Sequence, residues 1–144
     1  MRPTIIRTAI LTTAICFFMA TGAAAELTRD TIKTSDGVLT VHPINHATFV
    51  MTWGEHVVYV DPVGGSELFS EFEPPDLILI THIHGDHTST ETMRGVSTDT
   101  TRIVGPPTVA EKLGEGVPGE LAIVANGETF EFGGIRVEAV PAYN

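Results

Sequence analysis

The chain has 144 residues, of which 42% are hydrophobic and 18% charged, and its formal net charge is −10. This length suits a single domain, and the apolar share is ordinary for a globular protein and argues against wholesale disorder. The 18 acidic residues against 8 basic ones argue against a nucleic-acid partner, because binding to phosphates draws on clustered lysine and arginine. The single cysteine, Cys16, excludes an internal disulfide and a cysteine-rich zinc site.

The N-terminal segment 1–25 has the organisation of a secretory signal peptide. Arg2 and Arg7 give it a positive start, residues 9–20 are mostly apolar, and alanines at 23–25 offer a cleavage site. A short membrane anchor is the alternative, but the apolar stretch is shorter than the about 20 residues that a spanning helix needs. We therefore expect a periplasmic or secreted protein with no stable membrane span after cleavage. Removal of 25 residues leaves 119 of the 144 and takes away two arginines, which makes the mature chain more acidic.

The mature part, 26–144, reads as a mixed α/β domain in which apolar runs alternate with short turns. The turn Trp53-Gly54-Glu55 predicts a β-hairpin, because β-branched and aromatic runs flank a glycine-containing connection. The uninterrupted apolar run 76–81 predicts a strand covered on both faces. A helix is expected over 108–113, with proline near its first turn and Gly114 after its end. The other expected elements are strands at 38–41, 49–51, 57–60, 102–104, 121–124, 129–132 and 135–140, and partial helix near 91–94.

Three histidines and one aspartate lie within the six residues 82–87, which directly follow the apolar run 76–81. In an extended segment His82 and His84 project to the same side, and Gly85 allows a tight turn that brings Asp86 and His87 toward them. Imidazole nitrogens and carboxylate oxygens suit a divalent transition metal, zinc in particular. A solvated polar loop with coincidental histidines is the alternative, which this ordered set directly after an apolar strand disfavours.

The segment Thr81-His82-Ile83-His84-Gly85-Asp86-His87 resembles the H-x-H-x-D-H signature of the metallo-β-lactamase superfamily. This resemblance implies an α/β fold of the αββα sandwich type, with metals at one edge of the paired sheets. The similarity covers about residues 38 to 144. Its flanking parts, which are similar to the branch related to ascorbate-phosphate lactonase, are 45–49, 60–62, 127–128 and 134–142.

By matching positions, the resemblance implies that His82 and His84 bind a first Zn²⁺ ion and that Asp86 and His87 bind a second. Other divalent transition metals are possible. It also implies a hydroxide held between the two ions, because close cations lower the pKa of water and stabilise developing charge on a small-molecule substrate. Asp86 is the candidate catalytic residue, with a proton-transfer role as the intermediate collapses. Asp61 matches an aspartate that braces the metal-bearing loop, and an ordinary aspartate at the start of a loop is the alternative.

The other histidines and the tryptophan are expected outside the site. His42 and His56 are predicted to be surface residues, and His46 to be an ordinary polar residue of the loop before the hairpin. A position facing the site is the alternative for His46. Trp53 is predicted to pack at the hairpin turn rather than to stack on a substrate.

The chain departs from the family pattern after residue 87, where it has no further histidine. A complete dinuclear site of the family also needs a later histidine, a bridging aspartate and a final histidine. Asp99 lies too soon after the motif to be that bridge, and Asn144 follows Pro-Ala-Tyr where the lactonase-like branch often places a histidine. We therefore expect the N-terminal part of a larger catalytic unit, truncated after the first half. Two ligands for each metal are fewer than the three typical of a catalytic zinc, so this part alone is expected to bind metal weakly and to turn over substrate poorly. A natural half-domain, inactive or paired with another chain, is the alternative.

These observations predict an exported metal-dependent hydrolase with two zinc ions that acts on a small ester, lactone or phosphoester. β-Lactam hydrolysis is a second enzymatic possibility, although the flanking segments point elsewhere. Nuclease activity is disfavoured by the acidic charge, and oxygen-reducing di-iron chemistry by the absence of glutamate from the motif. The non-enzymatic alternative is a periplasmic metal-binding or interaction module. The sequence predicts neither the substrate nor the oligomeric state.

Overall fold

A computed structural model of the protein describes residues 28–114 and 116–142. The segment expected to be a signal peptide therefore lies outside the described residues. The helices are the 3-10 helix η1 (Ser66–Phe69), α1 (Thr90–Val96) and α2 (Pro107–Leu113). The strands are β1 (Asp30–Thr34), β2 (Gly37–Asn45), β3 (Thr48–Trp53), β4 (His56–Val60), β5 (Leu77–Leu79), β6 (Arg102–Gly105), β7 (Glu120–Ile123), β8 (Thr129–Phe132) and β9 (Ile135–Glu138). Within the described part, no helix is long and apolar enough to cross a membrane.

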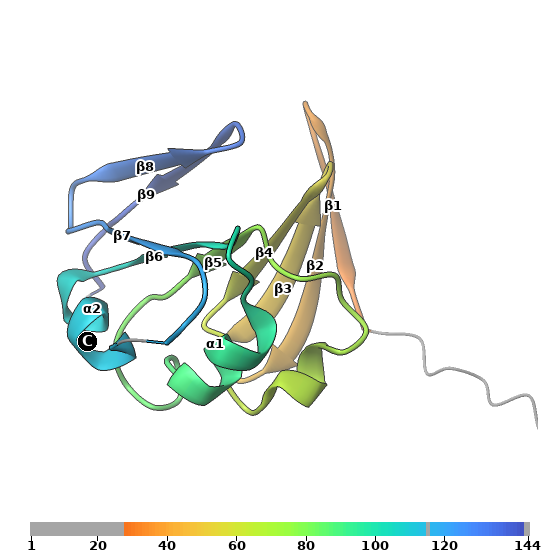
Figure 1. Ribbon diagram of the computed structural model, residues 1–144. Helices are drawn as coiled ribbons and strands as arrows, with labels where there is room; N and C mark the ends of the chain where they lie inside the picture. The colour runs from red at the N-terminus through yellow and green to blue at the C-terminus, as the bar shows by residue number, and fades with distance from the viewer. Residues whose placement is uncertain (1–27, 115, 143–144) are drawn as a thin grey trace, which may run out of the picture.

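Strands β1 to β7 form one mixed sheet in sequence order. The first four strands are antiparallel neighbours, whereas β4, β5, β6 and β7 run parallel to one another. Parallel neighbours need crossover connections, and these are almost always right-handed, so α1 and α2 are expected on the same face. Figure 1 shows both helices on one face of the sheet and the β8–β9 hairpin on the other.

The sheet separates two hydrophobic cores because its central strands are apolar on both faces. Toward the helices, Tyr59 and Ile78 pack with Met93 of α1 and Val109 of α2. Toward the hairpin, alternate residues of the same strands pack against its inward side chains. This second core contains Val58, Val60, Leu77, Val104 and Val124, with Phe130, Phe132, Ile135 and Val137 against it. The described residues thus form a helix layer, a seven-stranded sheet and a two-stranded hairpin on the opposite face of that sheet.

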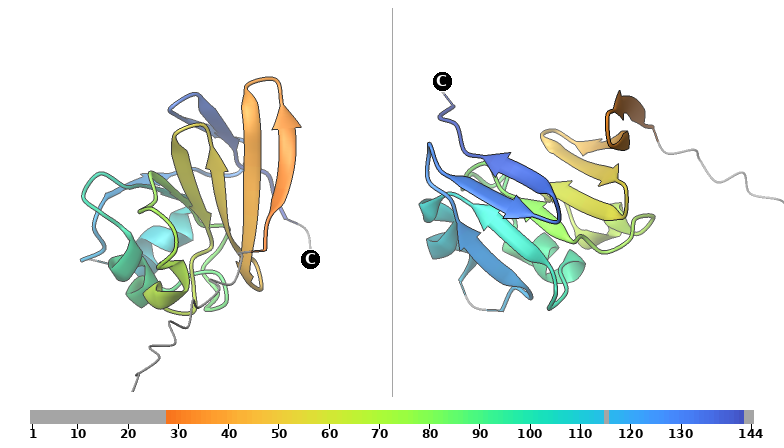
Figure 2. Two further views of the ribbon diagram at one scale, coloured as in Figure 1. Left: turned by 90° about the vertical axis from the view of Figure 1, so that its right-hand side faces the viewer. Right: turned by 90° about the horizontal axis from the view of Figure 1, so that it is seen from above.

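The hairpin covers only part of the sheet. The right-hand view of Figure 2 shows β8–β9 over the later strands, with β1 and β2 to one side. An apolar cavity of about 270 Å³ lies next to the hairpin, and Trp53 lines it together with Met51, Leu79 and Ile135. Trp53 therefore packs near the end of the β3–β4 hairpin, as the sequence predicted.

Most expected elements are present, and the differences have physical reasons. The strand β1 was not predicted, because it is a polar edge strand with all five residues exposed. The helix η1 was also missed. The strand predicted at 76–81 is shorter in the structure. It is β5, Leu77–Leu79, because the chain then turns into the histidine loop. The last strand ends at Glu138 rather than at residue 140.

The prediction that His42 is a surface residue is wrong. Its side chain points to the helix face of the sheet, opposite the buried Val50 of β3, and only 9% of the residue is exposed. The ring packs edge-on against Phe72, with centroids 5.1 Å apart. His56 is partly exposed and has a structural contact, because its Nε2 donates a hydrogen bond to the carbonyl oxygen of Gly133 at 2.9 Å. This contact joins the β3–β4 turn to the β8–β9 turn.

Tyr59 makes the stability of this core sensitive to alkaline pH. Its ring stacks on Phe69 and its hydroxyl donates to the carbonyl oxygen of Glu73 at 3.0 Å. Burial, with a smaller contribution from the Glu73 charge, raises the pKa of Tyr59 from 10.0 to about 12. Between these values the unfolded chain loses the proton that the folded chain retains, so stability falls as the pH rises.

We therefore predict that the free energy of unfolding of the wild-type protein falls more steeply between pH 9 and pH 11 than that of Tyr59→Phe. The variant keeps the buried ring and removes the ionisable hydroxyl, while all other titrating groups are shared. Urea unfolding at several pH values measures both slopes. Equal slopes for the two proteins would contradict the assignment.

Candidate metal site

The predicted metal-binding residues lie on a loop at the carboxyl end of β5. Parallel strands place their carboxyl ends along one edge of the sheet, so the residue that follows β4, Asp61, lies beside the loop that follows β5. The loop then folds back on itself. The amides of His87 and Thr88 donate to the carbonyl oxygen of His84, at 3.0 and 2.9 Å, and the Thr88 hydroxyl donates to that of His82. This tight turn replaces the strand ladder and gathers the side chains.

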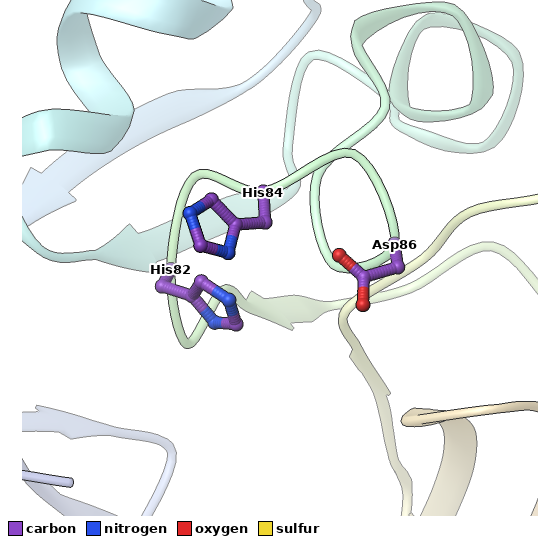
Figure 3. A group of neighbouring side chains, drawn as sticks. All are labelled: His82, His84 and Asp86. Carbon is purple, nitrogen blue, oxygen red and sulfur yellow. The ribbon is translucent and has the colours of Figure 1, made fainter. Parts of the chain in front are cut away.

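His82, His84 and Asp86 form a compact cluster of possible ligands. One ligand atom from each lies within 4.8 Å of the other two, and Figure 3 shows the two rings and the carboxylate around a common space. Zinc binds nitrogen and oxygen at about 2.0–2.2 Å, so ligands of one ion lie up to about 4 Å apart. The donor types therefore fit a zinc ion. The ligand atoms would have to move together by less than about 1 Å to bind the same ion. The site faces solvent, with 67% of the Asp86 side chain exposed.

His87 lies beside this cluster rather than in it. Its ring centroid is 3.9 Å from that of His82, and its Nε2 is 3.6 Å from a carboxylate oxygen of Asp86. The structure therefore brings all four predicted ligands together. Asp86 is grouped with His82 and His84, whereas the resemblance implied a pair of Asp86 with His87.

The carboxylate of Asp61 fixes the orientation of His87. Its Oδ2 is 2.7 Å from Nδ1 of His87, so the carboxylate accepts a hydrogen bond from this nitrogen and the other ring nitrogen, Nε2, is left on the Asp86 side. The same carboxylate accepts from the Thr81 amide at 2.7 Å and from the Thr81 hydroxyl at 2.6 Å. Asp61 is 1% exposed and has a positive φ of 45°. This geometry supports the bracing interpretation over that of an ordinary loop residue.

Two threonines of the site were missed by sequence reasoning. Thr81 links the Asp61 carboxylate to the loop, and its hydroxyl is also 3.1 Å from Nδ1 of His87. Thr88 is buried and closes the loop onto the His82 carbonyl. The available signal was position, since the two threonines directly flank the histidine motif. His46 is exposed in the β2–β3 turn, as expected of an ordinary loop residue.

Comparisons with known proteins identify the family. Residues 40–144 match the family described as Beta-lactamase superfamily domain. The crystal structure of a protein from Parabacteroides distasonis, assigned as a metal-dependent hydrolase, is 35% identical with a TM-score of 0.69. That match covers 81% of this chain and 52% of the other. CmlA, a diiron beta-hydroxylase from Streptomyces venezuelae, is 25% identical with a TM-score of 0.54, over 72% of this chain and 24% of CmlA. No curated protein matches the chain.

The chain therefore spans about half the length of the Parabacteroides protein and about a quarter of CmlA. Its mixed sheet, with helices on one face and a hairpin on the other, is the part of the sandwich that carries the histidine motif. With the family match over residues 40–144 and these structural similarities, the chain belongs to the metallo-β-lactamase superfamily.

Proposed function

We propose that the protein is an exported metal-dependent hydrolase that acts on a small ester, lactone or phosphoester. The observation that carries this proposal is the cluster of His82, His84 and Asp86, with ligand atoms within 4.8 Å of one another at a solvent-exposed sheet edge. The similarity to a protein assigned as a metal-dependent hydrolase supports the same reaction class. The N-terminal segment 1–25 supports export, because it has the pattern of a signal peptide.

The residues fit one metal ion, and they offer part of the site for a second. His82, His84 and Asp86 would supply the three protein ligands typical of a catalytic zinc. Nε2 of His87 lies 3.6 Å from a carboxylate oxygen of Asp86 and is the candidate ligand for a second ion. When bound, a divalent ion supplies Lewis-acid chemistry, lowering the pKa of water and stabilising negative charge that develops on a substrate. We propose zinc, with two ions in a complete site. Iron is the second candidate metal because CmlA is a diiron protein.

Two aspartates of the chain have different roles beside the metal. Asp61 holds the His87 ring in one orientation, so the loop is organised before a ligand binds. Asp86 projects into solvent, where its carboxylate can reach a substrate and transfer a proton. The net charge of −10 disfavours polyanionic substrates and is compatible with small molecules.

A non-catalytic metal-binding half-domain is the second candidate. It rests on the cluster of His82, His84 and Asp86 alone, because binding an ion there requires no substrate and no turnover. This candidate shares the metal site and differs in having no turnover. Measurements of metal binding and of activity therefore separate the two.

The purified protein should bind zinc through the histidine cluster. We predict that His84→Ala lowers zinc affinity at least about 100-fold, the upper range for loss of a supporting residue, because a ligand itself is lost. His46→Asn is the matched control, since it removes an exposed imidazole and tolerates the positive φ of 50° at this turn. Competition titration with a chromophoric chelator gives both affinities. Wild-type affinity in His84→Ala would exclude this site.

Asp61→Asn should weaken zinc binding by about 10–100-fold, because the amide cannot reproduce the three hydrogen bonds that the carboxylate accepts. Asp76→Asn is the control. Its carboxylate accepts a hydrogen bond from the Val57 amide at 2.8 Å, at the opposite end of the parallel strands. The control is expected to affect stability and to leave zinc affinity unchanged. If both variants bind zinc like the wild type, Asp61 does not organise the site.

Asp86→Asn tests the catalytic assignment. With a panel of lactones, esters and phosphodiesters, we predict a loss of kcat of at least about 100-fold, the lower range for general acid–base catalysis. Zinc content is measured in the same samples, since Asp86 is also a proposed ligand. Full turnover with full metal content would refute the role of Asp86. Turnover of any substrate by the zinc-loaded wild type would exclude the non-catalytic half-domain.

A further inference from the structure

A lysine from α2 contacts the backbone of the histidine loop. Lys112 lies in the last turn of this helix, and its Nζ donates a hydrogen bond to the carbonyl oxygen of Ile83. Ile83 stands between His82 and His84, so the contacted carbonyl lies between the two histidines of the cluster. The contact connects a helix to a loop 29 residues earlier in the chain.

The helix α2, which carries Lys112, is packed into the core through two buried side chains. Val109 and Leu113 are buried in the core on the helix face, with 0% and 4% exposure. Gly105 allows this close packing, because a Cβ at that position would lie 3.3 Å from three side-chain atoms of Val109. The backbone of α2 is therefore a fixed base from which a long side chain can reach the loop.

The centre of the loop, residues 83–86, is exposed to solvent. Asp61 accepts hydrogen bonds from the Thr81 amide at the start of the loop and from His87 near its end. The Thr88 hydroxyl donates to the carbonyl oxygen of His82. Between these anchors, Ile83 is 37% exposed and the Asp86 side chain 67% exposed. The hydrogen bond from Lys112 acts on this central part, and it comes from an element that the other anchors do not involve.

We propose that Lys112 is a positioning residue of the metal site, which holds the Ile83 carbonyl and thereby keeps His82 and His84 directed to the same side. This proposal rests on the proposed function. A positioning role and the charge of Lys112 alone predict opposite effects on metal affinity when the lysine is replaced. A lysine ammonium repels a nearby divalent cation, so loss of its charge alone would strengthen metal binding. Loss of a positioning contact weakens it, because the two imidazoles are no longer held in place.

The test compares Zn²⁺ affinity among Lys112→Met, Lys112→Arg and the control Lys33→Met, by competition titration of the purified protein. Lys33 is exposed on the edge strand β1, so its replacement removes the same charge away from the loop. We expect Lys112→Met to bind zinc about 10–100-fold more weakly than the wild type. Lys112→Arg, which keeps a cationic donor, and Lys33→Met should bind like the wild type.

A second readout needs no metal. Hydrogen–deuterium exchange of the segment 81–88 in the zinc-free protein should be faster in Lys112→Met than in the wild type and unchanged in Lys33→Met. Thermal unfolding of the same samples separates this local effect from a loss of global stability. Unchanged or tighter zinc binding in Lys112→Met, or a loss that Lys112→Arg does not restore, would overturn the proposal.

The proposed function and the role of Lys112 fail in different ways. If the wild type binds no zinc, the metal site itself is refuted, and the positioning role with it. If the wild type binds zinc, His84→Ala loses it and Lys112→Met retains it, only the role of Lys112 is refuted.

Discussion

The buried carboxylate of Asp61 is the constraint on which the candidate site depends. It lies at the end of β4 and accepts hydrogen bonds from the Thr81 amide, the Thr81 hydroxyl and Nδ1 of His87. A buried carboxylate is costly unless its oxygens are satisfied, and here they are satisfied by the histidine loop itself. The positive φ of Asp61 is part of the same arrangement, since backbone strain of this kind persists where the surroundings fix it. The interaction therefore ties one strand end to the adjacent loop.

The sheet explains why this interaction is possible. Strands β4 and β5 are parallel neighbours, and the Asp61 amide continues their pairing with a hydrogen bond to the Leu79 carbonyl oxygen at 2.9 Å. The parallel register pairs Val60 with Leu79, so the two chain segments leave the sheet at the same edge and the two loops begin side by side. The packed helices and the hairpin thus act on the site indirectly, by fixing the strands that carry it.

Much of this arrangement could be predicted from local pattern, and the remainder depends on contacts between distant residues. The apolar run before Thr81 and the same-side placement of His82 and His84 follow from strand periodicity. The contact of Asp61 with His87 spans 26 residues, and no periodicity encodes which strands become neighbours. His42 shows the opposite error, since a polar residue type suggested exposure and the β2 register buried it. The polar strand β1 carried no apolar signal.

We propose that the braced loop presents two imidazoles and a carboxylate to one metal ion. Anomalous diffraction at the zinc edge from zinc-loaded crystals locates such an ion. We expect a peak within about 2.0–2.2 Å of a nitrogen of His82, a nitrogen of His84 and an oxygen of Asp86, with Nδ1 of His87 still hydrogen-bonded to Asp61. A zinc peak bound elsewhere, or no peak on this loop, would contradict it.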